Sequence, residues 1–196
     1  MRLRDALQHA VSKPGAPSSD YDLNADAVLP ERTLREAGVL VAIVDDEVPR
    51  VILTKRSSAL KHHPGQISFP GGKVEESDAH VVEAALREAE EEISLTGVDV
   101  VGHLAPHETV TGFNVTPVVG LVQPGYSVTP DEREVAEAFD VPLDHLLSPQ
   151  NYMIESRLWR GQPRYFFTVP WGPYYIWGAT ARILRALADR MADAND

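Results

Sequence analysis

The sequence predicts an α/β fold in which a mixed β-sheet is packed by helices. Apolar runs of strand length are interspersed with helical segments but do not alternate strictly with them, which favours a mixed sheet over a regular parallel one. The chain ends in an amphipathic helix with an apolar stripe. Its 196 residues, 43% of them hydrophobic, suit one domain with a sizeable core. We therefore expect a single domain, with an N-terminal helix and arm over residues 1–33 and the main body over residues 34–196.

The first half of the chain begins with a short helix near residues 2–11, followed by a connecting arm rich in Pro, Gly and small polar residues. Apolar strands at residues 39–46 and 48–56 predict a hairpin. Residues 58–78 form a long loop rich in Gly and Pro, and such a loop inside a compact domain is usually functional or disordered. A helix follows over residues 79–93, with Ser77 or Asp78 as its expected N-cap.

The second half continues with strands near residues 98–107 and 115–122. Residues 130–147 hold an extended piece and then a short helix that starts at Pro142. Two late strands, at residues 152–159 and 164–171, flank a Gly-Gln-Pro turn. The terminal helix over residues 177–194 carries Ile183, Leu184, Leu187 and Met191 on one face.

The charge balance restricts the classes of partner. The formal net charge is −11, from 29 acidic residues against 18 Lys and Arg, which argues against nucleic-acid binding and against an anionic membrane surface. The chain has no cysteine, no signal-peptide pattern and no apolar run long enough to cross a membrane. We expect a soluble cytoplasmic protein with a small-molecule partner, and the oligomeric state stays open.

The stretch REAEEE, from Arg87 to Glu92, places four carboxylates within the predicted helix. Glu88, Glu91 and Glu92 follow the spacing i, i+3, i+4, so their carboxylates can converge on a face away from the apolar stripe. Mutual repulsion makes this a poor arrangement for helix stability, but Mg²⁺ and Mn²⁺ favour oxygen ligands. A solvated acidic face is the commoner explanation for such a run taken alone. The glycine-rich loop immediately upstream favours the alternative, because glycines permit close backbone approach to a ligand.

Two other phosphate-binding motifs are excluded. The Gly-Gly-Lys sequence resembles the end of a P-loop, but that motif requires Gly at position 67 and Ser or Thr at position 74. The chain has Ile67 and Val74 there. The G-x-G-x-x-G fingerprint of dinucleotide-binding folds is also missing from the sequence.

The segment GGKVEESDAHVVEAALREAEEEISL, residues 71–95, resembles the Nudix box of the Nudix hydrolases. It departs from the commonest form in two ways: the spacing from Gly72 to Arg87 is one residue longer, and Ser94 replaces the closing glycine. Both departures resemble the coenzyme A pyrophosphatase branch. The preceding segment LTKRSSALKHHPGQISFPGG, residues 53–72, resembles a second signature of that branch, and so does the C-terminal WGATARIL.

The resemblance implies the Nudix fold, a mixed β-sheet sandwiched between helices in three α/β/α layers. It implies metal-dependent hydrolysis of the diphosphate bond of coenzyme A or its derivatives, with 3′,5′-ADP and 4′-phosphopantetheine or its acyl form as products. Mg²⁺ or Mn²⁺ is the implied cofactor. Two alternatives remain: a Nudix pyrophosphatase for another nucleoside diphosphate derivative such as NADH or ADP-ribose, and a catalytically silent nucleotide-binding sensor.

The family pattern assigns Glu88 and Glu92 as metal ligands and Glu91 as a third ligand or a base that orients water. Arg87 is expected to orient the glutamates rather than to touch the substrate. Glu108, which follows a predicted strand, is the other candidate for the general base, and an exposed loop acid explains it equally well.

Six residues in the segment that precedes the predicted helix are candidates for substrate binding. Gly71 and Gly72 are expected to let the loop pass close to the site, and Lys73 is either a phosphate contact or a solvated loop side chain. Arg56 and Lys61 are candidates for the 3′-phosphate or the diphosphate of coenzyme A, since Arg suits bidentate phosphate contacts. His63 either donates a hydrogen bond to a phosphate or is an ordinary surface histidine.

Overall fold

The computed structural model of the chain describes residues 2–13, 15–24, 31–159 and 161–193. In chain order the elements are α1 (Leu3–Ser12), β1 (Ser18–Ser19), β2 (Arg35–Val44), β3 (Arg50–Arg56), β4 (Ile67–Ser68), β5 (Gly71–Lys73), α2 (Val81–Ile93), β6 (Asp99–His103), β7 (His107–Glu108), β8 (Phe113–Val122), β9 (Val135–Pro142), α3 (Leu143–Leu147), the 3₁₀ turn η1 (Pro149–Asn151), β10 (Met153–Trp159), β11 (Gln162–Thr168) and α4 (Gly178–Asp193). These elements confirm the predicted order of helices and strands.

The main sheet is mixed. Its central pair, β2 and β8, runs parallel over ten residue pairs. β3 joins β2 antiparallel at only two positions, Ile43 with Val51 and Val44 with Arg50, and then diverges to pair with β9. The predicted hairpin of β2 and β3 is thus formed at its turn only, because most of each strand pairs with a partner distant in sequence. Within the described residues this sheet has nine strands, and β10 and β11 form a separate pair.

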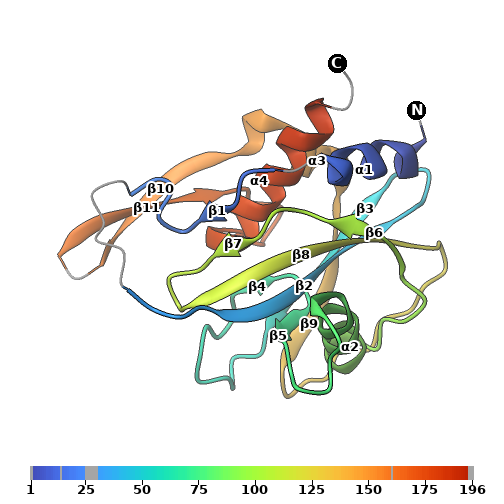
Figure 1. The fold of residues 1–196 in the computed structure, drawn as a ribbon, viewed down its shortest axis with the longest axis horizontal. Coiled ribbons are helices and arrows are strands. Elements are labelled where there is room, and N and C mark those ends of the chain that lie inside the picture. Colours follow the sequence, from blue (N-terminus) through green and yellow to red (C-terminus); the bar gives the residue numbers. More distant parts are fainter. Residues whose placement is uncertain (1, 14, 25–30, 160, 194–196) are drawn as a thin grey trace.

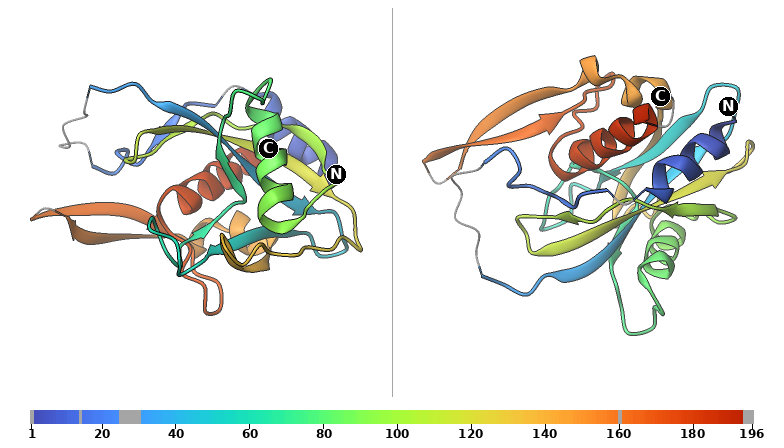
Figure 2. Two further views of the ribbon diagram at one scale, coloured as in Figure 1. Left: turned by 90° about the horizontal axis from the view of Figure 1, so that it is seen from below. Right: turned by 45° about the horizontal axis from the view of Figure 1, so that its top comes forward.

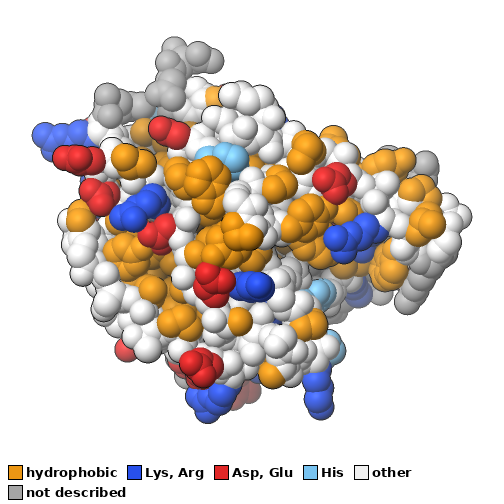
Figure 3. Space-filling view, turned by 180° about the vertical axis from the view of Figure 1, so that it is seen from behind, with side chains coloured by type: hydrophobic (Ala, Val, Ile, Leu, Met, Phe, Trp, Pro, Cys, Tyr) orange, Lys and Arg blue, Asp and Glu red, His pale blue; other side chains and the backbone are white. Residues whose placement is uncertain are grey.

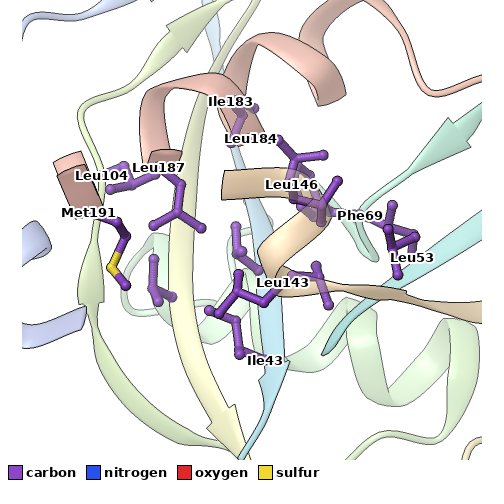
Figure 4. Packing of buried hydrophobic residues seen from close by; sticks show 14 of the residues in the cluster. Ile43, Leu53, Phe69, Leu104, Leu143, Leu146, Ile183, Leu184, Leu187 and Met191 are labelled. Atoms are coloured by element: carbon purple, nitrogen blue, oxygen red, sulfur yellow. The ribbon is translucent and has the colours of Figure 1, made fainter. Parts of the chain in front are cut away.

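Helices cover both faces of the main sheet, with α2 on one side and α1, α3 and α4 on the other (Figure 1). The alternation of side chains along β2 produces the two layers. Leu40, Ala42 and Val44 share a buried cluster with Ala85, Ala89 and Ile93 of α2. Val41 and Ile43 belong to the opposite cluster, where Leu184 and Leu187 of α4 and Leu143 and Leu146 of α3 pack (Figure 4). The α/β/α architecture predicted from the sequence is confirmed.

Two local predictions differ from the structure. The segment expected to be a continuous loop, residues 58–78, contains β4 and β5, which pair with β3 and β2. The expected N-caps Ser77 and Asp78 are also wrong, since α2 begins at Val81 and its N-cap His80 accepts a hydrogen bond from the backbone N–H of Glu83. The carboxylate of Asp78 is instead bound by Arg87. The first difference arises from pairing with strands outside the segment, and the second from a contact of Asp78 with Arg87 of α2.

The N-terminal segment is built into the same core. Leu7 and Ala10 of α1 are buried in the cluster that contains α4. The arm that follows contributes β1, which pairs parallel with β7. No helix in the described ranges is both long enough and apolar enough to span a lipid bilayer.

The hairpin of β10 and β11 extends from the body of the molecule (Figure 2). Hydrophobic side chains gather on this extension, seen at the right of the rear view (Figure 3). Its exposed large hydrophobic residues are Met153, Ile154, Leu158, Trp159 and Tyr165. The base of the hairpin lies beside α4, so the hairpin reaches outward from the face of the sheet opposite α2.

Candidate active site

Glycines bring strand β5 into direct contact with the acidic face of α2. A Cβ atom on Gly72 would lie 2.3 Å from Oε1 of Glu88, so only glycine leaves room for that carboxylate. The backbone N–H of Gly71 donates a hydrogen bond to Oε2 of Glu92 at 3.3 Å. Gly71 itself has φ of 154° and packs against Gly38 of β2, where a side chain would collide with the backbone. The predicted close approach of this loop to the site is present, and it is made to the carboxylates of α2.

Arg87 joins the loop to the helix. Its guanidinium donates to both carboxylate oxygens of Asp78 at 3.0 Å and to the backbone carbonyl of Lys73 at 3.3 Å. Nη1 also lies 3.2 Å from Glu88 and 3.2 Å from Glu91. These hydrogen bonds and charges raise the pKa of Arg87 above its ordinary value. Arg87 therefore contacts two glutamates of its own helix and the loop that precedes it.

Burial dominates the electrostatics of the two inner glutamates. Glu92 is only 4% exposed, and burial raises its pKa to about 8, with the Gly71 N–H opposing the rise and the charge of Glu88 adding to it. Burial also raises the pKa of Glu88, although Arg87 offsets part of the effect. Glu92 is buried and Glu88 is partly buried, and two such carboxylates that both resist ionisation lack a sufficient positive charge nearby. Their oxygen donors and their unmet charge fit a divalent cation.

The three box glutamates do not converge as a group, which corrects the expectation from their spacing. Among the described residues, no three Asp, Glu or His side chains are gathered closely enough to hold a metal ion. The side chain of Glu91 is 60% exposed and is turned toward Arg87, while Glu92 is buried beside β5. Helical spacing places the Cα atoms on one face but does not decide where the side chains point.

Glu134, on the loop before β9, is a fourth carboxylate that sequence reasoning missed. Its negative charge contributes to the raised pKa of both Glu88 and Glu92. The loop is held beside α2 because the backbone N–H of Asp131 donates to the carbonyl of Glu92 at 2.8 Å. Glu134 lies in an ordinary acidic run, PDEREV, so nothing in its local sequence marks it as part of a site.

A cavity of about 640 Å³ lies next to β5, on the face of the sheet that α4 covers. Five of the predicted substrate-binding residues line it: Arg56, His63, Gly71, Gly72 and Lys73. The remaining wall comes from β8, the hairpin, the start of α4 and the N-terminal arm. Of the residues predicted to bind substrate, only Lys61 is outside the lining, on the exposed part of its loop.

Arg56 is a cation of the cavity lining that acts on the buried Glu92. Its charge lowers the pKa of Glu92, opposing the larger effect of burial, and together with partial desolvation it lowers the pKa of His63. No carboxylate among the described residues forms an ion pair with Arg56 within 4.0 Å. Lys73, by contrast, has its Nζ 3.5 Å from Glu75. Arg56 is thus available to an anion at the end of the cavity next to β5.

Glu108 is placed differently from the other predicted site residues. It lies in β7, where its carboxylate is 3.2 Å from Nη2 of Arg32. The cavity lining includes the next three residues, 109–111, but not Glu108. Glu108 is thus ion-paired in β7 beside the cavity.

The arm preceding β2 forms one wall of the cavity, a role that the sequence did not indicate. Ser19, Asp20, Asp22 and Leu23 are among the lining residues. The side chain of Asn24 pairs with the backbone of Tyr165 in the hairpin, donating to its carbonyl and accepting from its N–H, both at 2.9 Å. Asp22 forms an ion pair at 3.0 Å with Arg182 of α4. The arm is thereby fastened to two elements from the end of the chain.

Asp20 is the central anchor of this arm. It accepts from the buried His107 at 3.3 Å and from the backbone N–H of Val110 at 2.8 Å, and it faces Arg164 at 3.6 Å. Burial works to raise the pKa of Asp20, but these partners hold it below the ordinary value. The second ring nitrogen of His107 is 2.9 Å from the hydroxyl of Ser18. This polar cluster links the arm to β7 and to the hairpin.

Comparison with known proteins agrees with this geometry. The family model described as NUDIX domain matches residues 34–160. Two proteins named uncharacterized Nudix hydrolase NudL, from Enterobacter sp. (strain 638) and Cronobacter sakazakii (strain ATCC BAA-894), are 42% and 43% identical over 156 residues, which cover 79% of this chain and 81% of each relative.

Solved structures agree at the level of the fold. The MutT protein from Methanosarcina mazei Go1 aligns with a TM-score of 0.53 at 20% identity, covering 86% of this chain and 99% of its own. A MutT/nudix family protein from Enterococcus faecalis has a TM-score of 0.53 at 14% identity, with 87% of this chain and 67% of its own chain covered. At such identities the likeness shows a shared fold.

Proposed function

Because the chain belongs to the Nudix hydrolase family, we propose that it hydrolyses the diphosphate bond of coenzyme A or of its thioester or disulfide derivatives. The products are 3′,5′-ADP and 4′-phosphopantetheine or its acyl form. One observation carries the proposal: the segment 53–72, which resembles the coenzyme A pyrophosphatase branch, supplies Arg56, His63, Gly71 and Gly72 to one cavity. The same two glycines contact the carboxylates of α2, so strand β5 adjoins both the cavity and the acidic helix.

The proposed roles follow from charge and position. Glu88 and Glu92 would hold Mg²⁺ or Mn²⁺, and Glu91 or Glu134 would join them after a change of side-chain rotamer, since no three carboxylates are gathered among the described residues. The bound ion would supply a Lewis acid and lower the pKa of a coordinated water. Arg87 acts as a positioning residue for Glu88 and Glu91, since it contacts both carboxylates and also the loop. Arg56, which has no carboxylate partner among the described residues, takes the diphosphate through bidentate hydrogen bonds.

The general base is assigned to Glu91 in preference to Glu108. The side chain of Glu91 is 60% exposed and lies on the same helix as the buried glutamates. Its contact with Arg87 is a solvent-exposed ion pair, which costs little to break. Neither glutamate lines the cavity, but Glu108 is only 29% exposed, is paired with Arg32 and lies in β7 rather than on α2.

A substrate panel tests the proposal directly. The protein is incubated with Mg²⁺ or Mn²⁺ and with coenzyme A, acetyl-coenzyme A, coenzyme A disulfide, NADH or ADP-ribose, and the products are quantified by liquid chromatography. We expect release of 3′,5′-ADP from the coenzyme A compounds with the highest kcat/KM of the panel. A higher kcat/KM on NADH or ADP-ribose would instead assign the chain to another Nudix specificity, and binding without turnover would indicate a sensor.

Two variants of α2 test the proposed metal site, one at a proposed ligand and one at an exposed glutamate that serves as the control. Glu88→Gln removes a proposed metal ligand and is expected to lower kcat by at least about 100-fold, as is common when a metal's charge stabilisation is lost. Glu90→Gln changes an exposed glutamate on the same helix and is expected to retain activity. Equal activity of the two variants would contradict the assignment of the site to this face of α2.

A further inference from the structure

The hairpin places two arginines directly opposite each other. Arg157 of β10 and Arg164 of β11 are cross-strand partners, and like charges in this position destabilise a β-pair. Arg164 is compensated by Asp20, whose carboxylate lies 3.6 Å from its guanidinium. Arg157 has no carboxylate within 4.0 Å among the described residues, and its strand neighbour Glu155 is instead bound by the hydroxyl of Tyr175 at 2.6 Å. The pair therefore carries one uncompensated positive charge.

Aromatic rings hold this uncompensated guanidinium in place. Its Cζ lies 4.9 Å from the ring centroid of Trp177, 5.7 Å from that of Tyr175 and 5.8 Å from that of Phe166. Phe166 and Trp177 also contact each other edge to face, with centroids 5.1 Å apart. Stacking orders an arginine without using up the N–H donors in the guanidinium plane. An ordered, partly unsatisfied guanidinium is well suited to bind an anion.

Among the described residues that line the cavity, Arg157 is one of two arginines without a carboxylate within 4.0 Å, since Arg164 faces Asp20. Of the other basic residues that line it, Arg182 is paired with Asp22 and Lys73 with Glu75. Arg56 is the second uncompensated one, and its charge acts on Glu92. The two come from separate elements, Arg56 from the end of β3 and Arg157 from the hairpin that extends away from α2 (Figure 2). One cavity thus presents two anion-binding positions, only one of which adjoins the acidic helix.

We propose that Arg157, ordered by Phe166 and Trp177, binds a second phosphate of the substrate that is not part of the diphosphate being cleaved. This inference rests on the proposed function, which makes the second phosphate the phosphomonoester on the ribose of coenzyme A. A phosphomonoester carries close to two negative charges at neutral pH and accepts bidentate hydrogen bonds from arginine. Arg157 is then a specificity-determining residue, and it takes the role that the sequence suggested for Arg56 or Lys61.

Substrates that differ only in that phosphate test the proposal. We would measure kcat/KM on coenzyme A and on 3′-dephospho-coenzyme A for the wild type, Arg157→Gln and Arg157→Lys. The wild type is expected to prefer coenzyme A. Arg157→Gln is expected to reduce this preference about 10- to 100-fold, the value of a charge-assisted hydrogen bond, and Arg157→Lys to reduce it less. Arg185→Gln is the matched control, because Arg185 also stacks on an aromatic ring but is paired with Asp189 and does not line the cavity.

A binding measurement with 3′,5′-ADP and 5′-AMP tests the role of Arg157 independently of whether the protein cleaves coenzyme A. By titration calorimetry, 3′,5′-ADP should bind the wild type more tightly than 5′-AMP, and Arg157→Gln should remove the difference. An unchanged preference in Arg157→Gln, or equal losses on both substrates, would overturn the role of Arg157. If the wild type cleaves neither coenzyme A compound, the proposed function fails, and the calorimetric comparison still decides whether Arg157 binds the second phosphate.

Discussion

Replacing Glu92 with glutamine should stabilise the metal-free protein, and by an amount that depends on pH. Glu92 is buried, and its pKa rises from 4.5 to about 8 on folding. The unfolded chain loses this proton near pH 4.5, whereas the folded protein keeps it until about pH 8. Folding therefore takes up a proton between these values, and the stability of the wild type falls as the pH rises through that range. Glutamine has no charge to bury and escapes this loss.

The size of the effect follows from the pKa difference. One pKa unit corresponds to about 1.4 kcal/mol, so the rise at Glu92 corresponds to roughly 5 kcal/mol above pH 8 and to almost nothing below pH 4.5. Relaxation around the site reduces this figure, and we expect Glu92→Gln to gain roughly 3 kcal/mol at pH 9. For a chain of this length the gain corresponds to a rise in Tm on the order of 10 °C.

Thermal unfolding followed by circular dichroism, with a chelator present, measures this difference at pH 5 and pH 9. Glu90→Gln serves as the control because Glu90 is exposed on the same helix, and its Tm should follow the wild type at both pH values. Equal effects of Glu92→Gln at the two pH values, or a lower Tm at pH 9, would refute the reasoning from burial. With Mg²⁺ present the order should reverse, since the wild type gains metal binding that the variant lacks, and kcat of the variant should fall by at least about 100-fold.

Three further changes test other parts of the site. Gly72→Ala should displace the carboxylate of Glu88, which lies 2.3 Å from the added Cβ, and it should lower kcat at least about 10-fold with little change in Tm. Gly71→Ala should instead lower Tm, because its added Cβ meets backbone atoms. A fully active Gly72→Ala enzyme would contradict the importance of the contact with Glu88. Asn24→Ala should release the arm from the hairpin and raise KM several-fold at unchanged Tm, as measured by initial rates; an unchanged KM would show that the arm does not shape the cavity. Glu134→Gln should weaken Mn²⁺ binding about 10-fold in a calorimetric titration, and an unaltered affinity would exclude this carboxylate from the site.

The parts of the site that the sequence predicted correctly are those that depend on near neighbours along the chain. The helix over α2, its buried stripe and its row of glutamates follow from a periodicity of 3.6 residues, and the contact of Arg87 with Glu91 is one turn apart. The contact of Gly71 with Glu92 already spans 21 positions, and it depends on the pairing of β5 with β2. The N-cap was misjudged because Asp78 is bound by Arg87, a partner nine residues away that competes with the capping role.

The spacing of residues along the helix does not determine the direction in which each side chain points. Glu88, Glu91 and Glu92 share a helical face, but Arg87 draws the first two toward the loop while burial and the Gly71 N–H hold the third beside β5. The raised pKa of Glu92 likewise depends on how deeply it is buried by the elements packed around it. Neither burial nor side-chain direction is a function of spacing alone.

By itself, the sequence determined the α/β class, the acidic helix, the glycine-rich segment before it and the membership of a hydrolase family. Tertiary contacts were needed to bring Asp20 and Asp22 of the N-terminal arm into the wall of the cavity, to let the charge of Glu134 act on Glu88 and Glu92, and to place Arg157, but not Lys61, in the cavity lining. The physical reason is the same in each case. Asp20 meets His107 and Val110 across 87 and 90 positions of the chain, and such contacts depend on strand pairing and on the packing of remote elements rather than on local spacing.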